Sequence, residues 1–343
     1  MSNAFIESLA RHNESEWLAA VASLAADIHT VDRDATQVWF RFYPLDLVRY
    51  LNSSDDIEEA KKGLAMQGDF GLADKIDTSH RFLYGHRFWP QVKAAVAARA
   101  EGGEAGAIAD EIRGIAKQVA ADAKTKESLT LGIAAVGLMT MVQVGPDAFK
   151  AAPGIAAKPS GLMAKSPESI VAERAKDDSQ GIFGFLKTVD KEFSVVRDEY
   201  SGGRFKVINE EEIASASQKD HSQDWQSMDE RCWDGPVPIE CTSASCGTCW
   251  VGVLGGAEKL SEPSARERKA MRVFGYNQPE GDRPFIRLAC QAKATGNVTI
   301  VVPPWNAVFG KKVRQNVEEA ELEPVTTSAK KLRETIASAV SGE

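Results

Sequence analysis

Four cysteines form the most specific pattern in the chain. Three of them lie in the run Cys241-Thr-Ser-Ala-Ser-Cys246-Gly-Thr-Cys249, which has the spacing C-x4-C-x2-C. The fourth, Cys290, follows after 40 intervening residues in the run Leu-Ala-Cys-Gln. No residue between the first three cysteines is larger than threonine, so the backbone there can form a tight loop. The pattern indicates one site shared by four sulfur atoms.

This spacing is the plant-type arrangement for a [2Fe-2S] cluster. Two irons bridged by two sulfides need four thiolates, two for each iron, and a tight loop aims its backbone N–H groups at the sulfurs. Zinc is the alternative, because four thiolates also bind Zn²⁺ tetrahedrally. Zinc ribbons use two similar close pairs, whereas here three cysteines cluster and Cys290 stands alone. We therefore predict an iron–sulfur site formed by Cys241, Cys246, Cys249 and Cys290.

From Asp190 to Pro304 the chain resembles the plant-type and adrenodoxin-like [2Fe-2S] ferredoxins, whose fold is a β-grasp. The shared features are a hairpin signal over Phe193–Ile208, the cysteine loop, a strand after Cys249 and the Leu-Ala-Cys-Gln run. The resemblance implies that Cys241 and Cys246 bind one iron and that Cys249 and Cys290 bind the other. With four thiolate ligands we expect a reduction potential of about −400 mV.

Two departures from that family concern the surroundings of the cysteines. Ala244 stands where many members have glycine, and a positive φ there would cost about 1 kcal/mol, so we expect a local difference in the backbone. The segment between Cys249 and Cys290 is also longer than usual. It predicts a helix with Ser264 and Glu267 as a capping box and with its charges facing a partner or solvent.

The fifth cysteine, Cys232, lies outside the four-cysteine pattern. We interpret it as a small buried hydrophobic residue, with ligand exchange or redox sensing as the alternative. His80 and His86 flank an aromatic and basic patch. We expect them to form a packed, hydrogen-bonded pair, with a metal or cofactor site as the alternative, and no C-x-x-C-H haem signature is present.

The fold class that we predict is multidomain, with an all-α N-terminal domain and an α+β, β-grasp [2Fe-2S] domain. The boundaries are a helical domain at 1–150, a linker rich in proline and glycine at 151–182, the ferredoxin-like domain at 183–310 and a charged tail at 311–343. Apolar periodicity predicts helices over Glu14–Ile28, Gln37–Leu51, Asp55–Leu64, Pro90–Ala100 and Ile108–Ala123. Asn13 and Asp34 are candidate N-caps, and the tail predicts a short helix over Ser328–Val340.

The strands expected in the ferredoxin-like domain are a hairpin and three further runs. Alternating residues predict the hairpin over Phe193–Tyr200 and Arg204–Ile208. The other β-rich runs are Cys249–Leu254, Phe285–Cys290 and Val298–Val302. The most apolar stretch of the chain, Leu129–Val144, is shorter than the roughly 20 residues that span a bilayer. We therefore interpret it as a buried helix or strand and do not expect membrane contact.

Composition and charge narrow the class of function. The net charge of −8 argues against nucleic acid or an anionic membrane as the main partner. The first 17 residues lack the pattern of a secretory signal, and free thiols suit a reducing compartment, so we expect a cytoplasmic protein. No nucleotide-binding or nucleophile motif is present, so nothing supports a flavin or NAD domain.

The resulting hypothesis is a ferredoxin-like carrier that moves single electrons between redox partner proteins through a [2Fe-2S] cluster. By itself such a carrier is not an enzyme. The alternatives are an electron-transfer subunit of a larger oxidoreductase complex, because a carrier needs only about a hundred residues, and a redox or iron sensor. The N-terminal domain shows no identifiable catalytic group, and the sequence names neither donor nor acceptor.

Overall fold

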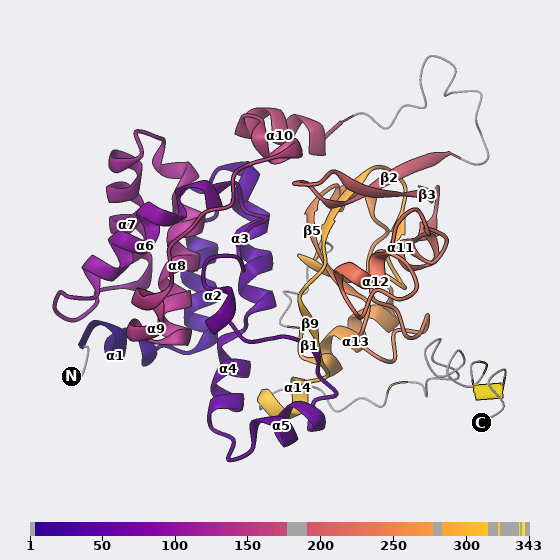
Figure 1. Cartoon of the computed structure of the whole chain (residues 1–343), viewed down its shortest axis with the longest axis horizontal. Coiled ribbons are helices and arrows are strands. Elements are labelled where there is room, and N and C mark those ends of the chain that lie inside the picture. The colour runs from indigo at the N-terminus through magenta and orange to yellow at the C-terminus, as the bar shows by residue number, and fades with distance from the viewer. Residues whose placement is uncertain are drawn as a thin grey trace. The chain divides into compact units, whose positions relative to one another are not determined.

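The structure is a computed structural model that describes residues 4–176, 191–276 and 283–314, with 322, 336, 338 and 339. The chain forms two compact units (Figure 1). The helical unit consists of Met1–Ser53, Phe70–Glu173 and Glu199–Ser201, and the α/β unit consists of Ser54–Asp69, Arg174–Asp198 and Gly202–Glu343. Apart from residues 336, 338 and 339, which are helical, the predicted tail helix lies outside the described residues, as do residues 177–182 of the predicted linker.

Helices make up the N-terminal region from residue 4 to residue 174, whereas the sequence predicts a helical domain over 1–150. They are α1 (Ala4–Ala10), α2 (Glu14–Ser23), α3 (Thr30–Phe42), α4 (Leu45–Asn52), α5 (Ile57–Gly63), α6 (Trp89–Arg99), α7 (Ile108–Asp122), α8 (Leu131–Val144), α9 (Pro146–Ala151) and α10 (Pro167–Arg174). Short 3₁₀ turns connect several of them, at Ala73–Lys75, Tyr84–Phe88, Glu127–Leu129 and Gly161–Ala164.

Helix α8 is the centre of the helical unit. Its side chains from Leu131 to Met141 are all buried, and it packs against α3, α6 and α7, between which it runs in Figure 1. Two glycines allow this close packing, because a Cβ at Gly132 would lie 2.3 Å from Thr36 and one at Gly137 would lie 2.7 Å from Val92. The apolar stretch is therefore a buried helix. Among the described residues, no helix is both long and apolar enough to cross a membrane.

Two of the predicted helix boundaries are wrong for a local reason. The stretch predicted as one helix over Gln37–Leu51 is broken into α3 and α4 at Tyr43 and Pro44. Proline has no N–H to donate and disfavours a helical residue before it, so α3 ends and α4 begins anew. Asn13 does cap α2 in a full capping box with Glu16, whereas Asp34 lies inside α3, whose N-cap is His29.

His80 and His86 form the packed pair that the sequence predicts. Their Nδ1 atoms lie 3.0 Å apart, the backbone N–H of Ala157 donates to Nε2 of His86, and Nε2 of His80 lies 3.2 Å from the carbonyl oxygen of Ile76. Burial lowers the pKa of His86 to about 4 and that of His80 well below its usual value. Two neutral rings can satisfy this chain of hydrogen bonds, so the pair is a packing element of the helical unit.

Strands and short helices make up the described part of the α/β unit. The strands are β1 (Gln67–Gly68), β2 (Glu192–Asp198), β3 (Gly203–Ile208), β4 (Glu211–Glu212), β5 (Trp250–Gly255), β6 (Ile286–Leu288), β7 (Lys293–Ala294), β8 (Val298–Val301) and β9 (Trp305–Asn306). Besides α5, the helices are α11 (Ile213–Ser217), α12 (Trp225–Met228), α13 (Ala265–Phe274) and α14 (Gly310–Val313).

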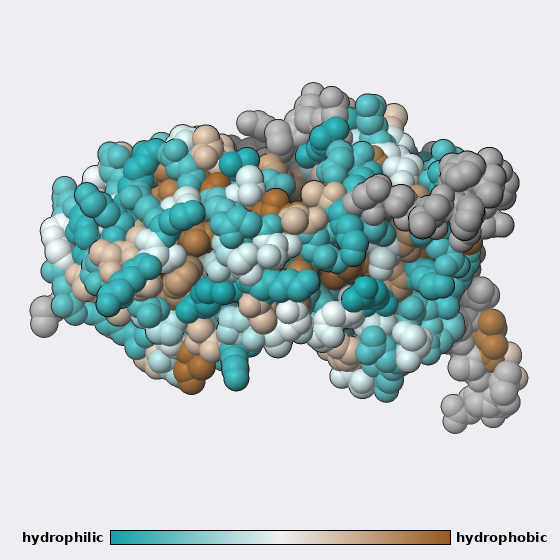
Figure 2. All heavy atoms as spheres, turned by 90° about the horizontal axis from the view of Figure 1, so that it is seen from above, coloured by the Kyte–Doolittle hydropathy of each residue, from teal (hydrophilic) through white to brown (hydrophobic). Residues whose placement is uncertain are grey.

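The main sheet of the described residues has five strands in the order β3-β2-β8-β5-β6. The hairpin β2–β3 is antiparallel, as predicted, and pairs Val195 with Phe205. Strand β8 runs parallel to β2 and antiparallel to β5, so the first and last strands of the sheet are neighbours at its centre. This mixed order agrees with the β-grasp expected from the resemblance. Hydrophilic residues cover most of the face seen in Figure 2, with apolar residues scattered among them.

A segment from the N-terminal half of the sequence completes the α/β unit. Strand β1 pairs antiparallel with β9, so that Gln67 lies opposite Asn306 and Gly68 lies opposite Trp305. The backbone N–H of Asp69 donates to Pro304, and that of Val308 donates to Leu64. The α/β unit therefore depends on residues that precede its main sequence by more than a hundred positions.

We predict that Gly68→Val destabilises the α/β unit. Gly68 has a φ of +74°, and a Cβ there would lie 2.3 Å from the carbonyl oxygen of Pro304. Left-handed strain and this clash together should lower the free energy of unfolding by about 2 kcal/mol or more, measured by chemical denaturation. Gly103→Val is the matched control, because nothing lies within 4 Å of a Cβ at that position. Equal stabilities of the two variants would contradict the pairing of β1 with β9.

Candidate metal centre

The strand register brings two of the four cysteines together. Cys249 directly precedes β5 and Cys290 follows β6 by two residues, and the two strands pair Trp250 with Leu288. The backbone N–H of Ala289 donates to the carbonyl oxygen of Cys249 at 2.9 Å. The thiols of Cys249 and Cys290 are within hydrogen-bonding contact as a result.

The cysteine loop, defined as residues 241–249, supplies the second pair. The Sγ atoms of Cys241 and Cys246 lie 3.1 Å apart. The two pairs also influence each other electrostatically, Cys241 acting on Cys290 and Cys246 acting on Cys249. The structure therefore gathers the four predicted residues into one site with two thiols on each side.

Backbone N–H groups of the cysteine loop point at the sulfurs. Those of Ser243 and Ser245 bond to the thiol of Cys241, and that of Ala244 bonds to the thiol of Cys290. Ala244 has a φ of +57° and Gly247 a φ of +72°, and such left-handed residues turn successive N–H groups toward one side. The loop is thus a nest that suits negatively charged sulfur.

Each thiol pair shares one proton unequally. The hydrogen bond with Cys246 lowers the pKa of Cys241 to about 5, and the same contact raises the pKa of Cys246. In the other pair the contact with Cys249 lowers the pKa of Cys290, while that contact and burial raise the pKa of Cys249. One member of each pair therefore favours the thiolate, which is the form that binds metal.

Access to the site differs among the four cysteines. Cys241, Cys249 and Cys290 are buried, whereas Cys246 is partly exposed. The side next to Cys246 is therefore where a group held by the four sulfurs would come closest to solvent.

Aromatic side chains from the long segment between Cys249 and Cys290 support the cysteine loop. The Oη of Tyr276 donates to the carbonyl oxygen of Gly247 at 2.8 Å, and its ring stacks on Trp250 with centroids 4.3 Å apart. A Cβ at Gly247 would lie 3.3 Å from the ring of Phe274. Burial raises the pKa of Tyr276 well above its usual value, so the phenol stays a neutral donor. Sequence reasoning missed Tyr276, whose only signal is its place beside a predicted helix.

The predicted helix of that segment is α13, and the prediction for its charges is wrong at Glu267. Ser264 does cap α13 by accepting from the N–H of Glu267, but the carboxylate of Glu267 is fully buried and faces the sheet. It accepts two hydrogen bonds from Arg287, each 2.8 Å long, and one from the backbone N–H of Leu288. This ion pair joins α13 to β6 shortly before Cys290.

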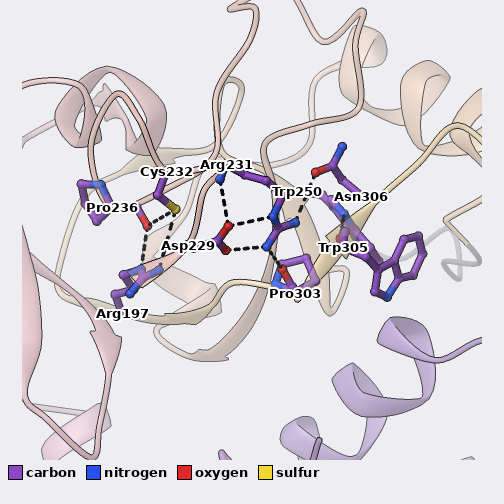
Figure 3. A network of polar contacts seen from close by, with 9 residues as sticks. All are labelled: Arg197, Asp229, Arg231, Cys232, Pro236, Trp250, Pro303, Trp305 and Asn306. Atoms are coloured by element: carbon purple, nitrogen blue, oxygen red, sulfur yellow. Dashed lines mark hydrogen bonds and ion pairs between the residues drawn. The ribbon is translucent and has the colours of Figure 1, made fainter. Parts of the chain in front are cut away.

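Cys232 has different neighbours from the four site cysteines (Figure 3). Its sulfur lies 3.6 Å from the carbonyl oxygen of Pro236 and 3.8 Å from the guanidinium of Arg197. Burial raises the pKa of its thiol to about 11. In the same view Arg231 bonds Asp229, Pro303 and Asn306. Cys232 is thus a buried, protonated thiol, as expected from the sequence.

The donor set fits a [2Fe-2S] cluster. Four thiols in two pairs match two thiolates for each of two irons, the lining residues are small, and the loop supplies N–H groups to the sulfurs. Across the described part of the chain, no group of three or more His, Cys, Asp or Glu side chains could hold a single metal ion.

We predict that Ala244→Gly raises the free energy of unfolding by up to about 1 kcal/mol. Glycine adopts the left-handed backbone without the clash of a Cβ, although its greater freedom when unfolded offsets part of the gain. Ala244→Val is the matched opposite, because a branched side chain at the same φ should destabilise the protein. Chemical denaturation measures both, and equal effects would contradict the loop conformation.

We predict that Glu267→Gln and Arg287→Met each lower the free energy of unfolding by about 3–5 kcal/mol, because each leaves a buried charge without its partner. The double variant Glu267→Gln with Arg287→Met should lose less than the sum of the two single changes. Denaturation curves test this, and strict additivity of the two effects would contradict the buried ion pair.

Comparison with known proteins agrees with this geometry. A model of the 2Fe-2S iron-sulfur cluster binding domain matches residues 218–295, a range that contains Cys241, Cys246, Cys249 and Cys290. No solved structure matched the chain. The helical N-terminal region has no assignment. The chain therefore contains, at residues 218–295, a ferredoxin-type domain that binds a [2Fe-2S] cluster, and such a domain implies electron transfer with redox partners.

Proposed function

We propose that this protein is a ferredoxin-like carrier whose [2Fe-2S] cluster is bound by Cys241, Cys246, Cys249 and Cys290. The observation that carries the proposal is the convergence of the four thiols as two pairs, Cys241 with Cys246 and Cys249 with Cys290. Each pair would bind one iron. The cluster would accept and release one electron at a time, at a potential of about −400 mV for four thiolate ligands.

The surroundings of the cysteines suit reversible transfer of an electron. The nest of backbone N–H groups offsets added negative charge, and packing by Phe274 and Tyr276 holds the loop in place in both oxidation states. Partial exposure of Cys246 offers partner proteins a short route to the cluster. Since thiols of this kind need a reducing compartment, we propose that the carrier works in the cytoplasm.

A second candidate is an electron-transfer subunit of a larger oxidoreductase complex. The helical unit favours it, because its described residues lie outside the matched range 218–295 and supply a large separate body that a simple carrier does not need. Gentle extraction followed by size measurement separates the candidates. A stable monomer that exchanges electrons with soluble reductases would reject the subunit.

We predict that the purified protein is coloured, contains two irons and two sulfides per chain, and gives an electron paramagnetic resonance signal after reduction with dithionite. Replacing any one of the four site cysteines with serine should abolish or alter that signal. Cys232→Ser is the matched control and should leave it unchanged, because Cys232 bonds only to Pro236 and Arg197 in the contacts described above. A colourless protein that contains zinc would overturn the proposed function.

A further inference from the structure

A carboxylate lies directly beside the cysteine loop. Glu240, which precedes Cys241, is half-buried and accepts hydrogen bonds at both oxygens. Nε2 of Gln67 donates to its Oε1 at 2.8 Å, and Oγ1 of Thr248 donates to its Oε2 at 3.3 Å. We call these three side chains the Glu240 relay. Gln67 belongs to β1, which lies outside the range matched by the cluster-binding domain.

Thr248, which belongs to the Glu240 relay, also contacts Cys246. Thr248 is buried within the cysteine loop, and both its backbone N–H and its hydroxyl are hydrogen-bonding partners of the Cys246 thiol. A hydroxyl has a single proton to donate. When Thr248 donates that proton to Glu240, it cannot donate it to the sulfur of Cys246. The hydroxyl of Thr248 can therefore donate to the carboxylate of Glu240 or to the sulfur of Cys246, but not to both at once.

The charge of Glu240 and the engagement of the Thr248 hydroxyl by Glu240 would both lower the reduction potential. The potential of an iron–sulfur centre depends on nearby charge and on hydrogen bonds to its sulfurs. A carboxylate one residue from a ligand disfavours the electron that reduction adds. Withholding the hydroxyl proton from the sulfur of Cys246 removes a bond that would stabilise the reduced state.

We propose that the Glu240 relay lowers the reduction potential of the cluster, with Gln67 as the positioning residue that turns Glu240 toward Thr248. This inference rests on the proposed function, because it needs a cluster bound by Cys246. In this proposal strand β1, which precedes the cysteine loop in the sequence, helps to set the reduction potential of the protein.

The first test compares midpoint potentials of full-length variants by redox titration with spectroscopic detection. Glu240→Gln removes the charge and provides a weaker acceptor for the hydroxyl, so its potential should shift in the positive direction. Gln67→Leu should shift it the same way by a smaller amount. Glu258→Gln is the matched control, because it removes an exposed glutamate of the same unit and should leave the potential unchanged.

A double-variant cycle separates the charge from the hydroxyl. In a Thr248→Val background the hydroxyl is absent, so Glu240→Gln can act only through its charge. The positive shift caused by Glu240→Gln should therefore be smaller in that background than in the wild-type protein. Equal shifts in both backgrounds would overturn the role of the hydroxyl.

The outcomes distinguish this inference from the proposed function. If the wild-type protein binds no [2Fe-2S] cluster, the proposed function fails first. If the wild-type protein and Glu240→Gln have the same cluster content and the same potential, the Glu240 relay is overturned while the proposed function stands. Should Glu240→Gln bind less cluster, Gln67→Leu decides, since Gln67 is not adjacent in sequence to any of the four cysteines, and an unchanged potential in that variant would overturn the relay.

Discussion

The four cysteine thiols must converge on one site, and the rest of the α/β unit is arranged to meet this constraint. The cysteine loop meets it only with a left-handed backbone at Ala244 and Gly247, and this curl turns N–H groups inward onto sulfur. Such a loop has little regular hydrogen bonding of its own. Its shape is therefore maintained from outside, by the β5–β6 register that holds Cys249 against Cys290 and by the aromatic rings behind Gly247.

The long segment between Cys249 and Cys290 serves this purpose through its buried side. Helix α13 turns Glu267 toward the sheet, and the carboxylate binds Arg287 and the backbone of Leu288. A buried ion pair adds little net stability over an apolar pair, but it tolerates few alternative arrangements because each charge must keep its partner. The ion pair and this backbone bond thus hold Arg287 and Leu288 in fixed positions at the end of β6, two residues before Cys290. The buried ion pair therefore fixes the position of Cys290 more than it adds net stability.

The sequence predicts those features that local patterns encode. Spacing identified the four cysteines, alternation identified the β2–β3 hairpin, and uniform apolarity identified α8 as buried. The sequence could not show that Glu267 pairs with Arg287, because the pattern of an amphipathic helix does not indicate which of its charged residues has a partner elsewhere in the chain. Tyr276 was missed for the same reason, since its value lies in a bond to Gly247 formed across the fold.

Strand β1 shows the strongest case of information that no local pattern carries. Gln67 and Gly68 are too short a strand to be recognised by periodicity, yet both pair with β9, and Gln67 bonds to Glu240, 173 positions away in the sequence. The chain enters the α/β unit at Ser54, leaves it after Asp69 and returns at Arg174. A fragment that starts at residue 183 would lack β1 and α5. The surroundings of the four cysteines therefore include residues 54–69, and the matched range 218–295 contains the cysteines without all of the residues that position them.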